Sequence, residues 1–395
     1  MYRNPDYDAL PKAERRGRLR EIALVFMRLG ALAFGGPAAH IAMMEEAVVQ
    51  RRAWLPRQKF MDLLGATNLI PGPNSTEMAI LLGFERGGYA GLFLAGAAFI
   101  LPAVFIVSIF AFLYVRFGAL PQVAGALVGV KPVIMAVVLQ ALLRLGKSAV
   151  KGALTAAVGV AVIALTFLGV EEILLLLCAG AITTAVMNWP RIRNRLFSLP
   201  LPMLALLVQP PAPARDAGPV SMALSSIFLT FFKIGAVLYG SGYVLLAYLD
   251  AEFVARFGVI TTQQLMDAVA VGQVTPGPVF TTATFIGYLI HGLPGGLAAT
   301  AGIFLPSFLL VLLINPIIPR LRKSPWVGAA LDGVNVASLG IMAVVTVRLG
   351  VASLIDPFTV ALFVVAAVLL LRYKVNSAWL ILGGGLLGYA YTALM

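Results

Sequence analysis

The sequence places a cation shortly before a glycine-rich turn at two points inside apolar segments. Arg28 precedes Phe34-Gly35-Gly36-Pro37, and Lys233 precedes Tyr239-Gly240-Ser241-Gly242. An ionisable side chain within an apolar segment is costly to keep and therefore indicates a functional site. Two such cations at corresponding places predict a site for a small anion. The alternative is that both side chains reach toward the polar surface or pair with nearby aspartates as structural contacts.

The chain also repeats a Pro-Gly-Pro turn, at residues 71–73 and again at 276–278. Proline and glycine break a helix at such a turn, and the helix that resumes has free N–H groups and the positive end of its dipole. Helix N-termini of this kind bind anions. The four turns and two cations together predict a binding site for a dianion. The expected ligands are Arg28, Gly35, Gly36, Pro37, Asn68, Pro71, Gly72, Pro73, Asn74 and Ser75 in the first half, and Lys233, Gly240, Ser241, Gln273, Pro276, Gly277 and Pro278 in the second.

Three carboxylates are candidates for carrying a coupled proton. Glu77 follows the first Pro-Gly-Pro turn and has no acidic counterpart after the second, whereas Asp62 and Asp267 occupy matching positions. A carboxyl removed from water favours its neutral form and can bind and release a proton. Glu77 is the preferred coupling residue, because Asp62 and Asp267 lie where helices begin. There they could equally stabilise a helix N-terminus or pair with Arg28 and Lys233.

Two further pairs of polar residues leave alternatives open. Asn68 and Gln273 stand just before the two Pro-Gly-Pro turns, either as donors to an oxyanion or as interhelical hydrogen-bond partners. Lys131 and Asp332 lie in corresponding segments, either lining a cavity or paired with other charges.

The amino-acid composition limits the classes of protein to which these residues can belong. The chain has 395 residues, 60% hydrophobic and 12% charged, with a mean hydropathy of +0.95, whereas soluble domains average about 25% charged residues. This excludes a cytosolic enzyme, a disordered chain and a nucleic-acid binder, despite a net charge of +12. One cysteine and two histidines exclude a disulfide framework and a zinc site. No nucleotide-binding or nucleophile motif is present, so we expect neither enzyme activity nor a cofactor.

The apolar segments predict an all-α polytopic membrane protein built from two homologous halves. Both the cation and the Pro-Gly-Pro turn recur at one constant displacement along the chain. An internal duplication explains this register. The predicted organisation is a basic cytoplasmic arm over 1–20, a first repeat with extra spans over 21–208, a Pro-rich linker over 209–220 and a second repeat over 221–395.

The distribution of charge predicts that the two repeats are inserted in opposite directions. The connector 45–59 is basic, whereas its counterpart 250–264 has a single arginine against two acids. Because cytoplasmic loops collect Lys and Arg, the halves form an inverted repeat, as in many secondary transporters.

Re-entrant helices resolve a conflict in this arrangement. The arm 1–20 and the connector 45–59 are both basic, so the segment between them must return to the side on which it began. We therefore expect 22–44 to be a hairpin broken at the Gly-Gly-Pro turn, and 60–84 to be broken likewise at the Pro-Gly-Pro turn. Residues 196–209 would supply the odd crossing that reverses the second repeat.

These motifs resemble the chromate ion transporter family in its long, two-domain form. The resemblance rests on Phe34-Gly35-Gly36-Pro37 with its echo at 239–242, and on the twin Pro-Gly-Pro turns preceded by residues 65–70 and 270–275. It covers roughly residues 20–371. It implies an inner-membrane carrier that exports chromate, driven by the proton motive force, and confers chromate resistance. Ser241-Gly242 departs from the Gly-Pro of the first repeat, so the two turns need not be equivalent.

The expected function is therefore secondary active export of chromate across the bacterial inner membrane, with a cytoplasmic N-terminus. The alternatives are a transporter of sulfate or another oxyanion, or an uncoupled anion channel. The expected partners are the oxyanion, protons as the coupling ion, the lipid bilayer and, as an option, a second copy of the chain; no nucleic acid is expected.

Overall fold

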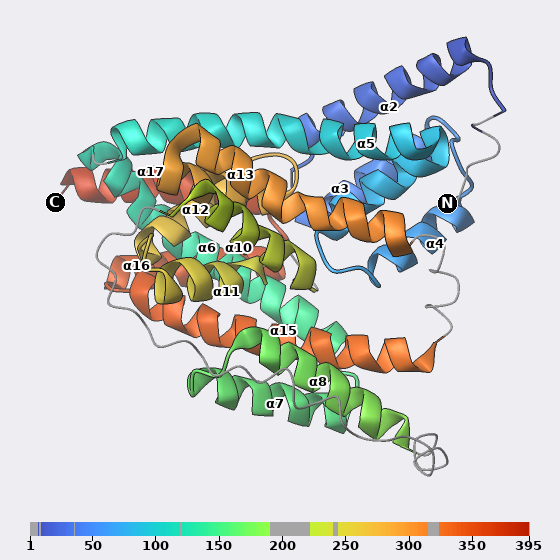
Figure 1. Cartoon of the computed structure of the whole chain (residues 1–395). Coiled ribbons are helices and arrows are strands. Elements are labelled where there is room, and N and C mark those ends of the chain that lie inside the picture. Colours follow the sequence, from blue (N-terminus) through green and yellow to red (C-terminus); the bar gives the residue numbers. More distant parts are fainter. Residues whose placement is uncertain are drawn as a thin grey trace.

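The chain is an assembly of helices. Within the described residues every element is helical (Figure 1), and five helices are long and apolar enough to cross a membrane. This confirms the predicted all-α membrane protein. The predicted linker 209–220 and crossing 196–209 lie outside the described residues, and the domain boundaries stay a prediction. The computed structural model describes residues 7, 9–34, 36–118, 120–189, 222–239, 244–314 and 324–394.

The first apolar segment is a hairpin and not a span. Its elements are α2 (Lys12–Leu32), α3 (Gly36–Glu45) and the π-helical turn η1 (Glu46–Gln50). Gly36 begins the returning arm with a φ of +78°, which favours glycine. The chain then comes back to its starting end, because Trp54 donates a 2.9 Å hydrogen bond to Glu21. The predicted re-entrant hairpin is thereby confirmed.

The second hairpin is broken at the first Pro-Gly-Pro turn. Its elements are α4 (Arg57–Thr67) and the start of α5 (Asn74–Phe117). Both arms meet again at one end, where Lys59 Nζ lies 3.2 Å from Glu85 Oε2. The turn itself, residues 71–73, is buried at the far end of the hairpin.

Helix α5 then folds back on itself at Gly87-Gly88, where the backbone leaves the helical region. Gly83 and Gly91 pack directly against each other, although eight residues of straight helix would separate them by about 12 Å. The outer arm, residues 89–117, has a length of about 43 Å, which is enough to cross a bilayer.

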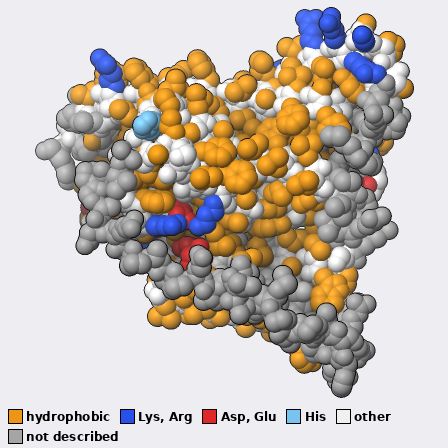
Figure 2. All heavy atoms as spheres, viewed as in Figure 1, with side chains coloured by type: hydrophobic (Ala, Val, Ile, Leu, Met, Phe, Trp, Pro, Cys, Tyr) orange, Lys and Arg blue, Asp and Glu red, His pale blue; other side chains and the backbone are white. Residues whose placement is uncertain are grey.

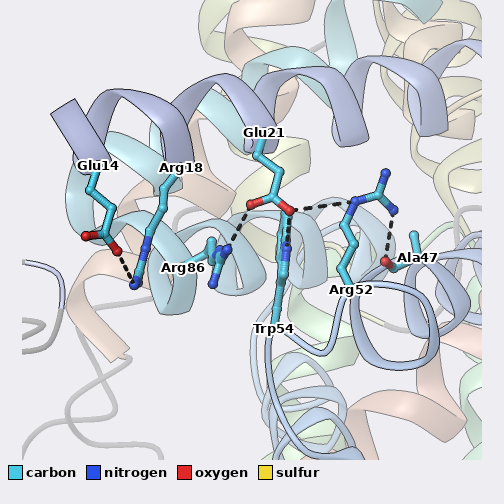
Figure 3. A network of polar contacts seen from close by, with 7 residues as sticks. All are labelled: Glu14, Arg18, Glu21, Ala47, Arg52, Trp54 and Arg86. Atoms are coloured by element: carbon cyan, nitrogen blue, oxygen red, sulfur yellow. Dashed lines mark hydrogen bonds and ion pairs between the residues drawn. The ribbon is translucent and has the colours of Figure 1, made fainter.

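A cluster of polar contacts closes the mouth of the two hairpins (Figure 3). Glu21 accepts hydrogen bonds from Arg86 and Trp54, both at 2.9 Å, and lies 3.8 Å from Arg52. Burial opposes ionisation of this carboxyl, but these hydrogen bonds and the charges of Arg86 and Arg52 outweigh it and lower the pKa of Glu21 below its usual value. Glu21 therefore joins α2 to the connector between the two hairpins, through Trp54 and Arg52, and to α5, through Arg86.

The second repeat has the same order of elements. They are α10 (Leu224–Val237), α11 (Leu245–Leu249), η2 (Asp250–Arg256), α12 (Thr262–Val274), η3 (Val279–Thr281) and α13 (Thr282–Ile314). Thr261 and Gln264 form a capping box that starts α12. Helix α13 folds back at His291-Gly292, as α5 does at its paired glycines.

The two repeats open toward opposite ends of the molecule. The outer arm of α5, then α6 (Pro121–Ala149) and the shorter α7 (Ala153–Phe167), lead the chain from the Glu21 cluster to Glu171. Lys233 of α10 lies 3.8 Å from Glu171. In Figure 1, α2 begins at one end and α17 (Ser377–Leu394) finishes at the other. This is the predicted inverted repeat.

The repeats interlock through their last helices. Helix α6 packs against α16 (Pro357–Arg372) and α17, while α15 (Pro325–Ser353) packs against α7 and α8 (Glu172–Met187). At these crossings Gly129 meets Gly384 and Gly388, and Gly333 meets Ala179. Small residues allow such close backbone approach.

Candidate functional site

The broken helices meet in two pairs, each joining one repeat to the other. Gly72 donates its N–H to Leu238 O at 2.8 Å, and Gly277 donates its N–H to Ala33 O at 2.9 Å. Ala33 and Leu238 end α2 and α10, so each Pro-Gly-Pro turn binds the first break of the other repeat. Unwound backbone at membrane depth must be satisfied by protein or water, and here the opposite repeat supplies the partner.

Buried polar side chains gather at the first Pro-Gly-Pro turn. Glu77 is wholly buried, and its carboxylate has no ion-pair partner among the described residues. Ser307, from α13 of the other repeat, is also wholly buried, and its hydroxyl interacts with the Glu77 carboxylate. A Cβ on Gly72 would lie 2.5 Å from Glu77 Oε1 and 2.6 Å from Ser307 Oγ. Both polar groups therefore lie against this turn.

The second Pro-Gly-Pro turn lacks these groups. A Cβ on Gly277 would meet the methyl group of Ala103 at 2.8 Å and the carbonyl oxygen of Gly30 at 2.9 Å. Ala103 follows Leu101-Pro102 as Ser307 follows Leu305-Pro306, so an apolar residue replaces the hydroxyl. The buried carboxyl and hydroxyl groups therefore lie at the first turn and not at the second.

Two amide side chains border the first turn. Asn68, which ends α4, is exposed and accepts a 2.9 Å hydrogen bond from Asn74 Nδ2. The first amides of α5, those of Asn74 and Ser75, have no acceptor within the helix because the helix starts there.

Asp267 belongs to a separate cluster that joins α12 to the first repeat. Tyr114 Oη donates a 2.8 Å hydrogen bond to Asp267 Oδ2, and Lys131 Nζ lies 4.0 Å from Oδ1. The charge partner of Asp267 is thus Lys131, and the alternative of a pair with Lys233 is wrong. Asp62, its counterpart, is only partly buried.

The two predicted cations have different neighbours. Lys233 lies 2.8 Å from Glu252 and 3.8 Å from Glu171, whereas Arg28 lines a groove between α2 and η1. The expectation that Arg28 and Lys233 together bind one dianion stays a prediction.

Comparison with known proteins identifies the family. A chromate transporter profile matches residues 20–184 and 225–389, one match on each repeat. The chain belongs to the chromate transporter family. Similar relatives include the chromate transport protein of Cupriavidus metallidurans, which is 33% identical over 93% of this chain and 92% of its own length. The probable chromate transport protein of Synechococcus elongatus is 31% identical over 89% of each chain, and the chromate transport protein of Pseudomonas aeruginosa is 29% identical over 92% and 90%. No solved structure matches.

In this chromate transporter the predicted ligand residues lie in different surroundings. The amides of Gly72 and Gly277 hold the repeats together and are not free for an anion. Gly35, Gly240 and Ser241 lie outside the described residues. Gly36 and Pro37 start α3, while Pro71, Pro73, Pro276 and Pro278 are buried in the turns and Gln273 is buried on α12.

Sequence reasoning missed Ser307 and Tyr239. Tyr239 Oη donates a 3.0 Å hydrogen bond to Leu69 O, which ties the end of α10 to the segment before the first Pro-Gly-Pro turn. For Ser307 a signal existed, because it directly follows the repeated Leu-Pro dipeptide. Nothing in the linear order indicated that it would lie against Gly72 of the other repeat.

Proposed function

We propose that this multi-pass membrane protein exports chromate, or another tetrahedral oxyanion of the same charge, across the bacterial inner membrane with its N-terminus in the cytoplasm. The observation that carries the proposal is the first Pro-Gly-Pro turn, where a buried acid lies beside the N-terminus of α5 inside a broken hairpin. The relatives named as chromate transport proteins support the choice of substrate.

The oxyanion binds at the N-terminus of α5 in this proposal. The free amides of Asn74 and Ser75, the positive end of the helix dipole and the side chain of Asn68 supply its hydrogen bonds. Arg28 is not assigned to this position, because it lies in the groove beside η1.

Glu77 competes with the oxyanion for the same helix terminus. An ionised Glu77 would itself satisfy the positive end of α5 and repel a dianion. The oxyanion therefore binds when Glu77 is protonated, and one proton accompanies each dianion. The pair carries one net negative charge outward, which gains about 2.3 kcal/mol per 100 mV of an inside-negative potential. The electrical component of the proton motive force thus drives export.

The test is efflux of chromate from liposomes that contain the purified protein. Potassium-loaded vesicles with valinomycin set the membrane potential, and sulfate serves as competitor. We expect saturable efflux that an inside-negative potential accelerates and sulfate inhibits. Flux that does not saturate would indicate a channel, and flux equal to that of protein-free vesicles would refute oxyanion transport.

A further inference from the structure

An open groove of about 410 Å³ lies on the first hairpin, away from the Pro-Gly-Pro turns. It runs between α2 and η1, from Arg51 and Arg52 at the mouth to Leu32 near the break. Three arginines and one glutamate line it, together with apolar side chains: Arg28, Arg51, Arg52, Glu46, Val25, Leu29, Leu32, Met43 and Ala47. The groove therefore combines positive charge with an apolar wall.

Arg28 is the uncompensated charge of this groove. In the second repeat the matching cation, Lys233, lies 2.8 Å from Glu252. In the first repeat Glu46 lies near the place of Glu252, and the carbonyls of both accept the N–H that closes a π-helical turn. Glu46, however, pairs with Arg51, and among the described residues no carboxylate lies within ion-pair distance of Arg28. Arg28 is exposed, so its guanidinium group is open to an anion from outside the chain.

The surroundings of the groove show which kind of anion fits. Leu24, Met27 and Leu32 lie on the same side of α2 and are 58%, 52% and 53% exposed, as expected of a face that meets lipid chains. Toward the helix start the exposed residues become Lys12, Arg16 and Arg20, and Figure 2 shows basic side chains gathered at that end above a mostly apolar surface. The change from basic to apolar marks the level of the lipid headgroups.

We propose that the groove binds an anionic phospholipid. Its phosphate lies between Arg28, Arg51 and Arg52, and an acyl chain follows Val25, Leu29 and Met43 toward the break. A phosphodiester supplies the charge that Glu46 does not, and guanidinium groups bind phosphate in bidentate fashion. A free oxyanion would leave the apolar wall without a partner, whereas a lipid covers it.

Native mass spectrometry of the purified protein tests the proposal, with phosphatidylglycerol and phosphatidylcholine of identical chains as probes. We expect preferential retention of phosphatidylglycerol and at least about fivefold weaker retention by Arg28→Gln, since one basic residue near the membrane surface contributes that factor. Arg28→Lys should keep most of the phosphatidylglycerol retention. Glu46→Gln should increase that retention, because it removes the one acidic residue that lines the groove.

The matched control is Arg57→Gln, which removes an exposed arginine paired with Glu45 outside the groove and should leave lipid retention unchanged. An Arg28→Gln protein that unfolds is recognised by its lost thermal transition, in which case the Glu46→Gln increase alone decides. Equal retention of the two lipids, or displacement of phosphatidylglycerol by inorganic sulfate at a concentration that supports transport, would overturn the assignment.

Discussion

Replacing Gly72 by alanine should damage the centre of the fold through two separable effects. Gly72 has a φ of +130°, and forcing a residue with a side chain into such a region costs about 1–3 kcal/mol. The new methyl group would also lie 2.5 Å from Glu77 Oε1 and 2.6 Å from Ser307 Oγ, and such overpacking adds about 1–3 kcal/mol. The expected loss of stability is therefore about 2–6 kcal/mol.

Gly169→Ala separates the two effects. Gly169 also has a positive φ, of +82°, but nothing lies within 4 Å of the position of its Cβ, so it reports strain alone. Thermal unfolding of both variants in one detergent, followed by tryptophan fluorescence, gives the comparison. Gly72→Ala should unfold at a clearly lower temperature than Gly169→Ala. Equal transition temperatures would refute the placement of Glu77 and Ser307 against the turn.

Three other variants test separate parts of the structure. Glu21→Gln should weaken the contacts of Glu21 with Trp54, Arg86 and Arg52 and expose Trp54, which would shift its fluorescence emission to the red. Because the pKa of Glu21 is lowered, these contacts are intact in the wild type at neutral pH and are lost as the pH falls through the pKa of the folded protein. The Gln variant should lack this pH transition. Gly384→Val should lower the free energy of unfolding by about 1–3 kcal/mol through overpacking against α6. Gly383→Val should not, because nothing lies within 4 Å of the position of its Cβ. Similar losses of stability in the two variants would contradict the packing of α17 on α6. Asp267→Asn leaves Lys131 without its partner and should cost about 3 kcal/mol while leaving the pH dependence of transport intact; a flattened pH profile would make Asp267 the coupling residue.

Much of the architecture could be predicted because it rests on local rules. Pro-Gly-Pro and Gly-Gly-Pro turns cannot continue a helix, and their recurrence in register revealed the duplication. The basic connector 45–59 required the first segment to return to its starting side, and the Trp54 to Glu21 hydrogen bond shows that it does. These inferences needed only backbone chemistry and the preference of Lys and Arg for one side of a membrane.

The site could be predicted only in part because it is formed between the repeats. Matching positions suggested that Arg28 and Lys233 act together, but the two cations have different surroundings, since Lys233 lies beside Glu252 and Glu171 whereas Arg28 lines a groove. The inverted repeat brings Ser307 to Gly72, two residues with no relation in the alignment of the halves. Glu77 could be singled out because it breaks the symmetry of the repeat.

Proton coupling at Glu77 is tested most directly by oxyanion efflux from proteoliposomes at a fixed inside-negative potential, from mildly acidic to mildly alkaline pH, for the wild type and Glu77→Gln. Sulfate is the decisive substrate, because it stays a dianion over this range, and a trapped dye follows the accompanying protons. We expect wild-type sulfate efflux to slow as pH rises and to carry protons, whereas Glu77→Gln should transport sulfate at a rate that does not change with pH and should move no protons. A Glu77→Gln protein that retains the wild-type pH profile and proton movement would contradict it.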